Sequence, residues 1–68
     1  MGSTEYLLGL LDNIYDQIDE AYKYNHTYMP TANKEIAEKI EKMLDNVREY
    51  IAIKQAEFSR PQNETNKA

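Results

Sequence analysis

Apolar and polar positions repeat with a helical period in two stretches of the chain. In the first stretch, the spacings alternate between three and four residues, through Leu7, Leu11, Ile14, Ile18, Ala21, Asn25 and Tyr28. The second stretch repeats the pattern with Ile36, Ile40, Met43, Val47 and Tyr50, and it is widened by Ala37, Leu44, Ile51 and Phe58. This rhythm predicts two amphipathic helices with coiled-coil-like apolar stripes, and it does not fit the alternation of a strand.

Capping and helix-breaking residues mark the expected helix ends. Ser3 can cap the first helix, and Pro30 is expected to end it at Tyr28, because a proline disfavours the helical conformation of the residue before it. Thr31 or Asn33 can then cap the second helix. The link is short, so the two helices should be antiparallel neighbours.

These signals together predict one small all-α domain. We expect an antiparallel two-helix hairpin over residues 3–59, with helices over about residues 3–28 and 31–59. A polar C-terminal tail over residues 60–68 contains no large apolar side chain. The chain has 68 residues and no cysteine, so a disulfide cannot compensate for a small core.

Each predicted helix carries a wider apolar sector than one partner helix covers. At about 100° per residue, the sectors span roughly 160° and 140°, with Leu8, Tyr15 and Tyr22 on the flank of the first stripe. We therefore expect the stripes to pair two hairpins into a four-helix bundle, as a homodimer or a higher oligomer. The residues predicted to contact a second copy or another protein are Tyr6, Leu8, Leu10, Tyr15, Tyr22, Leu44, Tyr50, Ile51, Ile53 and Phe58.

Charge is distributed unevenly between the two helices. The net charge is −4, and the first helix carries five acidic residues against Lys23 alone. Its outward carboxylates form an acidic stripe, made by Asp12, Asp16, Asp19 and Glu20. This stripe is either ordinary solvated surface or a docking face for a basic site. The isoelectric point near 4.8 disfavours nucleic-acid binding.

The sequence gives no pattern for catalysis, a cofactor or a metal ion. His26 is the only histidine, and no Glu-x-x-His pair is present. The carboxylates point outward on the helical wheel, whereas acid–base pairs need a sheltered pocket. We therefore expect a protein that is not an enzyme and that holds no cofactor and no metal.

The pattern as a whole favours a non-enzymatic protein–protein interaction module, an adaptor or regulator that self-associates through its apolar stripes. One alternative is an acidic inhibitor, of the kind that viruses and plasmids encode, which docks on a basic site through the acidic stripe. A second alternative is an obligate subunit or chaperone-like partner of a larger complex. Without a secretory signal or a run of about 18 apolar residues, a cytoplasmic protein with no membrane partner is expected.

Overall fold

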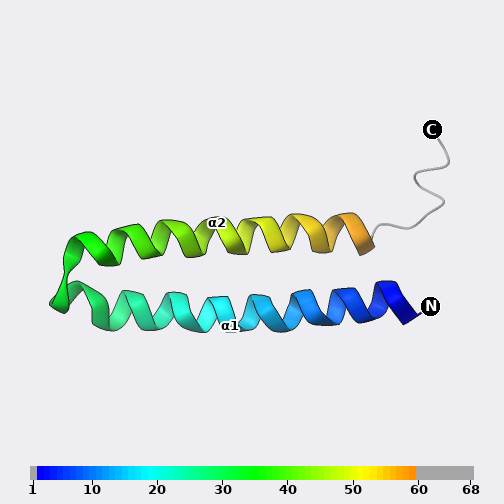
Figure 1. The fold of residues 1–68 in the computed structure, drawn as a ribbon, viewed down its shortest axis with the longest axis horizontal. Helices are drawn as coiled ribbons and strands as arrows, with labels where there is room; N and C mark the ends of the chain where they lie inside the picture. Colours follow the sequence, from blue (N-terminus) through cyan, green and yellow to red (C-terminus); the bar gives the residue numbers. More distant parts are fainter. Residues whose placement is uncertain (1, 60–68) are drawn as a thin grey trace.

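Two long helices joined by a single residue make up the part of the chain, residues 2–59, that the computed structural model describes. Helix α1 spans Gly2–Ala32 and helix α2 spans Lys34–Ser59. The helices run side by side in opposite directions and contact each other (Figure 1). The all-helical hairpin predicted from the sequence is confirmed. The tail predicted over residues 60–68 lies outside the described residues.

Asn33, the residue between the helices, ends one helix and caps the other. Its backbone N–H donates a 2.8 Å hydrogen bond to the carbonyl oxygen of Met29. Its side-chain Oδ1 accepts a 2.9 Å hydrogen bond from the backbone N–H of Ile36, as an N-cap residue does. Of the two capping candidates, Asn33 fills the role, whereas the Thr31 hydroxyl donates a 2.9 Å hydrogen bond to the Tyr28 carbonyl within α1.

Pro30 lies inside α1, which ends at Ala32, four residues later than the sequence predicts. Proline has no N–H, so Pro30 cannot donate the usual helical hydrogen bond to the carbonyl of His26. His26 is exposed, so its carbonyl lies at the surface, and the missing bond is within two turns of the end of the helix. The proline therefore weakens the last turn without ending the helix.

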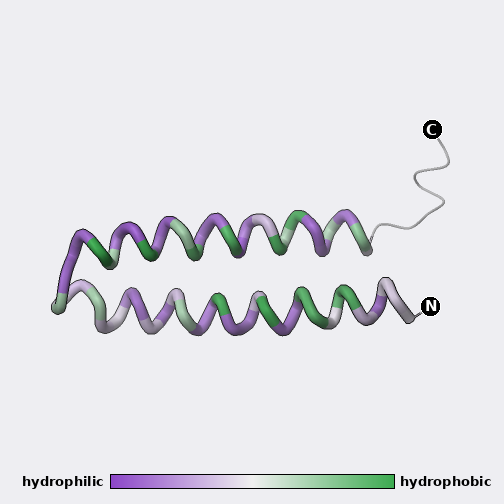
Figure 2. Tube along the Cα trace, in the orientation of Figure 1, coloured by the Kyte–Doolittle hydropathy of each residue, from purple (hydrophilic) through white to green (hydrophobic). Residues whose placement is uncertain are grey.

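The two helices meet along a seam of partly buried side chains. In a molecule of two helices, a side chain loses exposure mainly by facing the other helix, so burial identifies the seam. From α1 the seam contains Leu7, Leu8, Leu11, Tyr15, Ile18, Asp19, Tyr22, Asn25 and Met29. From α2 it contains Ala37, Ile40, Glu41, Leu44, Arg48, Ile51, Lys54 and Gln55. Hydrophobic and hydrophilic residues alternate along α2 and along the middle of α1, whereas residues 22–28 of α1 are hydrophilic or tyrosine (Figure 2).

The seam of α1 is rotated away from the predicted stripe. The sequence pattern places Ile14, Ala21 and Tyr28 between the helices, but all three are exposed. Tyr15 and Tyr22, predicted on the flank, are half-buried at the seam instead. On α2, the stripe residues Ile36, Met43, Val47 and Tyr50 are exposed as well, so apolar positions of both helices face outward.

The core between the helices is thin. Within residues 2–59, the buried residues are Asn25, Ala37 and Ile51, and one of the three is polar. None of the described side chains has less than 2% of its surface exposed. Burial between the two helices alone therefore supplies little of the apolar contact that stabilises a folded chain.

Candidate interaction surface

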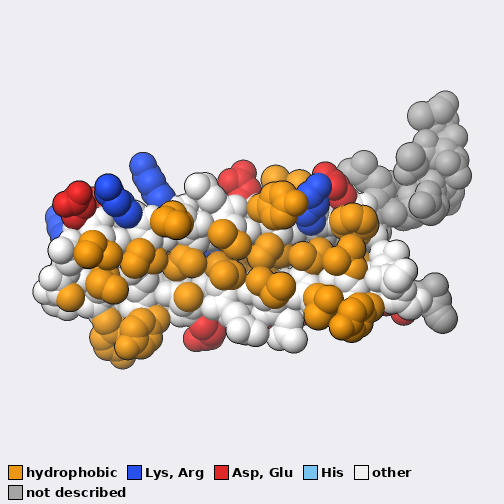
Figure 3. All heavy atoms as spheres, viewed as in Figure 1, with side chains coloured by type: hydrophobic (Ala, Val, Ile, Leu, Met, Phe, Trp, Pro, Cys, Tyr) orange, Lys and Arg blue, Asp and Glu red, His pale blue; other side chains and the backbone are white. Residues whose placement is uncertain are grey.

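One side of the hairpin is an apolar surface to which both helices contribute (Figure 3). We call it the apolar face; its large exposed side chains are Leu10, Ile14, Tyr24, Tyr28, Ile36, Met43, Val47, Tyr50 and Phe58. Each of them keeps at least 40% of its surface exposed. Monomeric proteins rarely expose large contiguous apolar patches, and the patches that do occur are often interaction sites.

Two hollows in the apolar face show that the apolar positions of both helices share this side. The hollow near the turn is lined by Glu20, Ala21, Tyr24, Asn25, Met29, Ile40 and Leu44. The hollow near the open end of the hairpin is lined by Leu7, Leu11, Tyr50, Lys54 and Phe58. Each hollow therefore combines residues of α1 and α2, and the apolar face extends from the turn to the open end.

The opposite side of the seam is closed by charged and aromatic groups, which we call the polar edge. Arg48 Nη1 donates a 2.6 Å hydrogen bond to Asp19 Oδ1 on α1, and Nη2 donates a 2.7 Å hydrogen bond to Asp45 Oδ1 on α2. The guanidinium carbon lies 4.0 Å from the centroid of the Tyr22 ring, within cation–π range. Arg48 thus joins the two helices through an ion pair and a ring contact.

Glu41 adds a second link across the polar edge. The Tyr22 hydroxyl donates a 3.1 Å hydrogen bond to Glu41 Oε2, and this bond raises the pKa of Tyr22. His26 Nδ1 lies 3.8 Å from Glu41 Oε1, and the His26 ring stacks on that of Tyr22. The hydrogen bond from Arg48 lowers the pKa of Asp19, so this carboxylate is held ionised.

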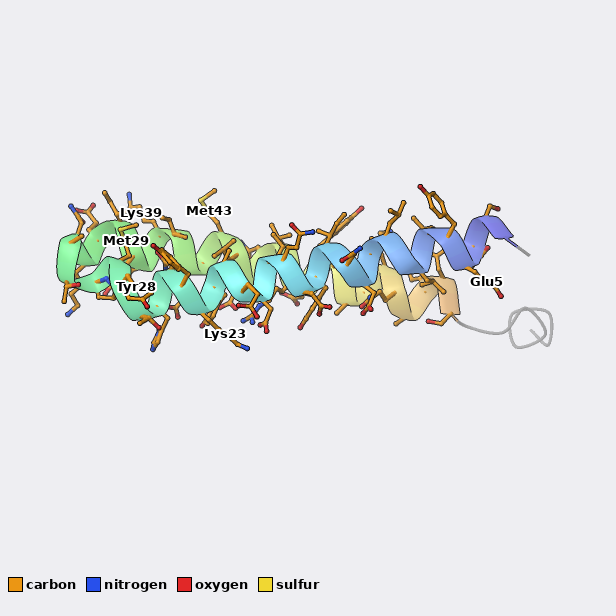
Figure 4. The ribbon with its side chains drawn as sticks, turned by 90° about the horizontal axis from the view of Figure 1, so that it is seen from below. Glu5, Lys23, Tyr28, Met29, Lys39 and Met43 are labelled. Atoms are coloured by element: carbon orange, nitrogen blue, oxygen red, sulfur yellow. The ribbon has the colours of Figure 1, made fainter. Side chains whose placement is uncertain are left out.

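The two sides of the hairpin are therefore chemically opposed. Figure 4 shows Met29 and Met43 projecting on one side and Lys23 on the other, where Lys23 lies 3.4 Å from Asp19. Asp19 and Ala21 are two residues apart on α1 and so face nearly opposite directions. Side-chain contacts of Arg48 and Glu41 bridge the helices on the polar edge, next to a hollow lined by Tyr15, Asp45, Arg48, Glu49 and Ala52, and the apolar side carries the two hollows described above.

The structure separates the ten predicted contact residues into three groups. Those turned toward the seam are Leu8, Tyr15, Tyr22, Leu44 and Ile51. Those on the apolar face are Leu10, Tyr50 and Phe58, with exposed Tyr6 beside them at the open end. Ile53 is 48% exposed, and its position on α2 is about 100° away from the apolar face.

Five residues of the apolar face were predicted for the stripes and are absent from the ten predicted contact residues: Ile14, Tyr28, Ile36, Met43 and Val47. No local pattern in the sequence distinguishes these positions from those at the seam. In the structure, the Arg48–Asp19 ion pair and the Tyr22–Glu41 hydrogen bond bridge the helices while these stripe residues are turned outward.

The acidic stripe is divided between two roles. Asp19 pairs with Arg48 and Lys23, so its charge is engaged within the hairpin. Asp12 and Asp16 are exposed on the outer side of α1, and exposed Glu20 lines the hollow near the turn. The stripe therefore is not one uniform surface.

Residues 2–59 contain no group of three histidine, cysteine or acidic side chains placed to hold a metal ion. Neither helix within this range is long and apolar enough to cross a membrane. No protein-family model, no curated protein and no solved structure matches the chain.

Proposed function

We propose that this protein is a non-enzymatic protein–protein interaction module, an adaptor or regulator of the cytoplasm, that self-associates through the apolar face. The observation that supports the proposal most directly is the apolar face itself, where nine large side chains stay exposed while the core holds two buried apolar residues. A second copy laid on this face would give a four-helix bundle whose core is the two apolar faces.

The apolar side chains of the apolar face are spread along the whole length of both helices. Nine of them keep at least 40% of their surface exposed, from Ile36 beside the turn to Phe58 near the open end. A standard protein–protein interface buries about 800 Å² on each partner, through about 20–30 residues. A second copy with the same two-helix face has the length to cover these side chains.

Charge at the rim of the apolar face is compatible with a copy of the same chain. Glu20 lines the hollow near the turn, and Lys54 lines the hollow at the open end. Lys39 projects on the same side as Met43 (Figure 4). Because both signs are present, two identical faces can approach each other without a block of like charges between them.

Sedimentation equilibrium over a range of concentrations tests the proposal with one matched pair of variants. Met43 and Ile53 are exposed apolar residues of the same helix, at 65% and 48%, and Met43 alone is on the apolar face. We expect Met43→Lys to shift the protein to monomer, because it buries a charge in the interface. Ile53→Lys should leave the assembly unchanged.

The result also separates self-association from obligate pairing with another protein. A self-associating module should show a melting temperature that rises with its own concentration. An obligate subunit of another complex should remain poorly helical alone and gain helicity only with its partner. A well-folded monomer at micromolar concentration, unaffected by Met43→Lys, would contradict the proposal.

Exposed Asp12 and Asp16 support a second candidate function, an acidic inhibitor of a basic site. These carboxylates lie on the outer side of α1 and would stay accessible in a dimer. Such binding should weaken with added salt, and Asp12→Lys with Asp16→Lys should abolish it while leaving the sedimentation behaviour unchanged.

A further inference from the structure

We infer that the second copy packs with its turn at the same end of the bundle, so that each α1 lies over the partner's α2. This inference rests on the proposed self-association. A face made of two antiparallel helices can meet its copy in two symmetric ways. With the two-fold axis along the hairpin, the turns lie together and α1 faces the other copy's α2. With the axis across the hairpin, the turns lie at opposite ends and α1 faces α1.

The net charges of the helices separate these two arrangements. Helix α1 has five acidic residues and one basic residue, a net charge of −4; helix α2 has six and five, a net charge of −1. Neighbouring helices in a bundle are about 8–10 Å apart, and diagonal ones are about 14 Å apart. Screening at physiological salt acts over about 8 Å. Placing the two α1 helices on the diagonal therefore reduces the strongest repulsion in the bundle.

The shape of the apolar face favours the same arrangement. The hydrogen bond between Tyr22 and Glu41 shows which residues of the two helices lie at the same height along the hairpin. Ala21 is one residue farther from the turn than Tyr22, and Met43 is two residues farther from it than Glu41. Ala21 and Met43 therefore lie at nearly the same height. Ala21 lines the hollow near the turn, and Met43 projects from the face with 65% of its surface exposed. With the turns together, Met43 of each copy would lie over Ala21 of the other, a flexible side chain filling a hollow.

A rim contact between opposite charges would follow from this geometry. Counted from the Tyr22–Glu41 contact, Glu20 is two residues farther from the turn and Lys39 two residues nearer to it, so they are about 6 Å apart along the bundle axis. Glu20 lines the hollow in α1, and Lys39 projects from the same side of α2. With α1 over the other copy's α2, these two long side chains can reach each other. With α1 over α1, Glu20 approaches acidic α1 instead.

Distances between spin labels on the two copies test the arrangement directly. The sequence contains no cysteine, so Lys34→Cys and Glu5→Cys each give one label per chain, beside the turn and at the open end. Both residues are exposed and lie off the apolar face. We expect both variants to give short distances, about 15–30 Å, because diagonal helices in a bundle are about 14 Å apart.

The outcomes of the labelling experiment distinguish failure of the shared-end arrangement from failure of self-association. A dimer in which the Lys34 labels lie about 45 Å apart, the length of the 31-residue α1, would overturn the shared-end arrangement and leave self-association intact. A labelled protein that sediments as a monomer at every concentration would overturn both. Circular dichroism of each labelled variant confirms that the hairpin is folded.

Charge reversal gives an independent readout in the unlabelled protein. With the turns together, Glu20→Lys should weaken dimerisation by about tenfold, and adding Lys39→Glu should restore it. With the turns at opposite ends, Glu20→Lys would relieve repulsion between the two α1 helices and strengthen the dimer. Asp16→Lys makes the same charge change on the outer side of α1 and serves as the control.

Discussion

Asn25 and Ala37 are joined across the seam by a buried hydrogen bond, in which Asn25 Nδ2 donates to the Ala37 backbone oxygen over 2.9 Å. Both residues are about 5% exposed. The Asn25 Oδ1 is buried without a hydrogen-bond partner among residues 2–59. The bond connects one defined point of α1 to one defined point of α2, so it specifies the level at which the helices pair.

Replacing Asn25 separates the cost of its unpaired oxygen from the benefit of its hydrogen bond. We expect Asn25→Leu to raise the free energy of unfolding by about 1 kcal/mol, because a buried unpaired carbonyl costs about 1–3 kcal/mol. Asn25→Ala should lower it by about 1 kcal/mol, because the hydrogen bond and the side-chain packing are both lost. Urea denaturation followed by circular dichroism measures both changes. Equal destabilisation by leucine and alanine would show that the amide is not a net cost.

Ile51 and Ile53 form a matched pair for testing where the core lies. Ile51 is 4% exposed at the seam, and Ile53, two residues further along α2, is 48% exposed. Ile51→Ala should reduce the free energy of unfolding by about 2–4 kcal/mol, through lost burial and the cavity left behind. Ile53→Ala should change it by less than about 0.5 kcal/mol. Similar losses at the two positions would place the seam elsewhere on α2.

The hydrogen bond between Arg48 and Asp19 predicts a dependence of stability on pH. It lowers the pKa of Asp19 below the usual 3.8, so folding favours the ionised carboxylate. The stabilisation is present above the pKa of the unfolded chain and is lost as the pH falls through the lower pKa of the folded chain. Asp19→Asn should therefore be less stable than the wild type at neutral pH, and the difference should shrink in acid.

Denaturation midpoints measured over a pH series check this expectation. Asp16→Asn is the control, because it removes an exposed carboxylate from the same helix. A constant difference between wild type and Asp19→Asn down to acidic pH would mean that ionisation of Asp19 does not contribute to folding.

The hairpin could be predicted from the sequence because helix periodicity and a short link leave few other folds for 58 described residues. Which face of α1 packs against α2 could not be predicted from the sequence. Four residues belong both to the predicted stripe and to the observed seam, and the apolar sector is wide enough for either: Leu7, Leu11, Ile18 and Asn25. The choice depends on contacts between distant residues, such as the ion pair of Arg48 with Asp19, which no local pattern encodes.

The same ambiguity explains the mixed outcome for the predicted contact surface. The α1 residues assigned to it lay beside the expected stripe, so rotation of α1 moved Tyr15 and Tyr22 to the seam and left Ile14 outside. The excess of apolar surface did not depend on this choice. A sector wider than one seam leaves an exposed apolar face whichever way the helix is turned.

The two capping candidates, Asn33 and Thr31, make different hydrogen bonds at the turn, so their replacement should affect stability differently. The Asn33 side chain accepts a 2.9 Å hydrogen bond from the Ile36 N–H, whereas the Thr31 hydroxyl bonds back to Tyr28 within α1. Asn33→Ala should therefore lower the free energy of unfolding by about 1 kcal/mol, because the first turn of α2 loses its side-chain cap. Thr31→Ala should have little effect, since alanine favours the helix and no cap is removed.

Amide hydrogen exchange at Ile36 gives a local readout: its protection should fall in Asn33→Ala and stay unchanged in Thr31→Ala. Loss of protection in the threonine variant instead would move the cap of α2 to Thr31.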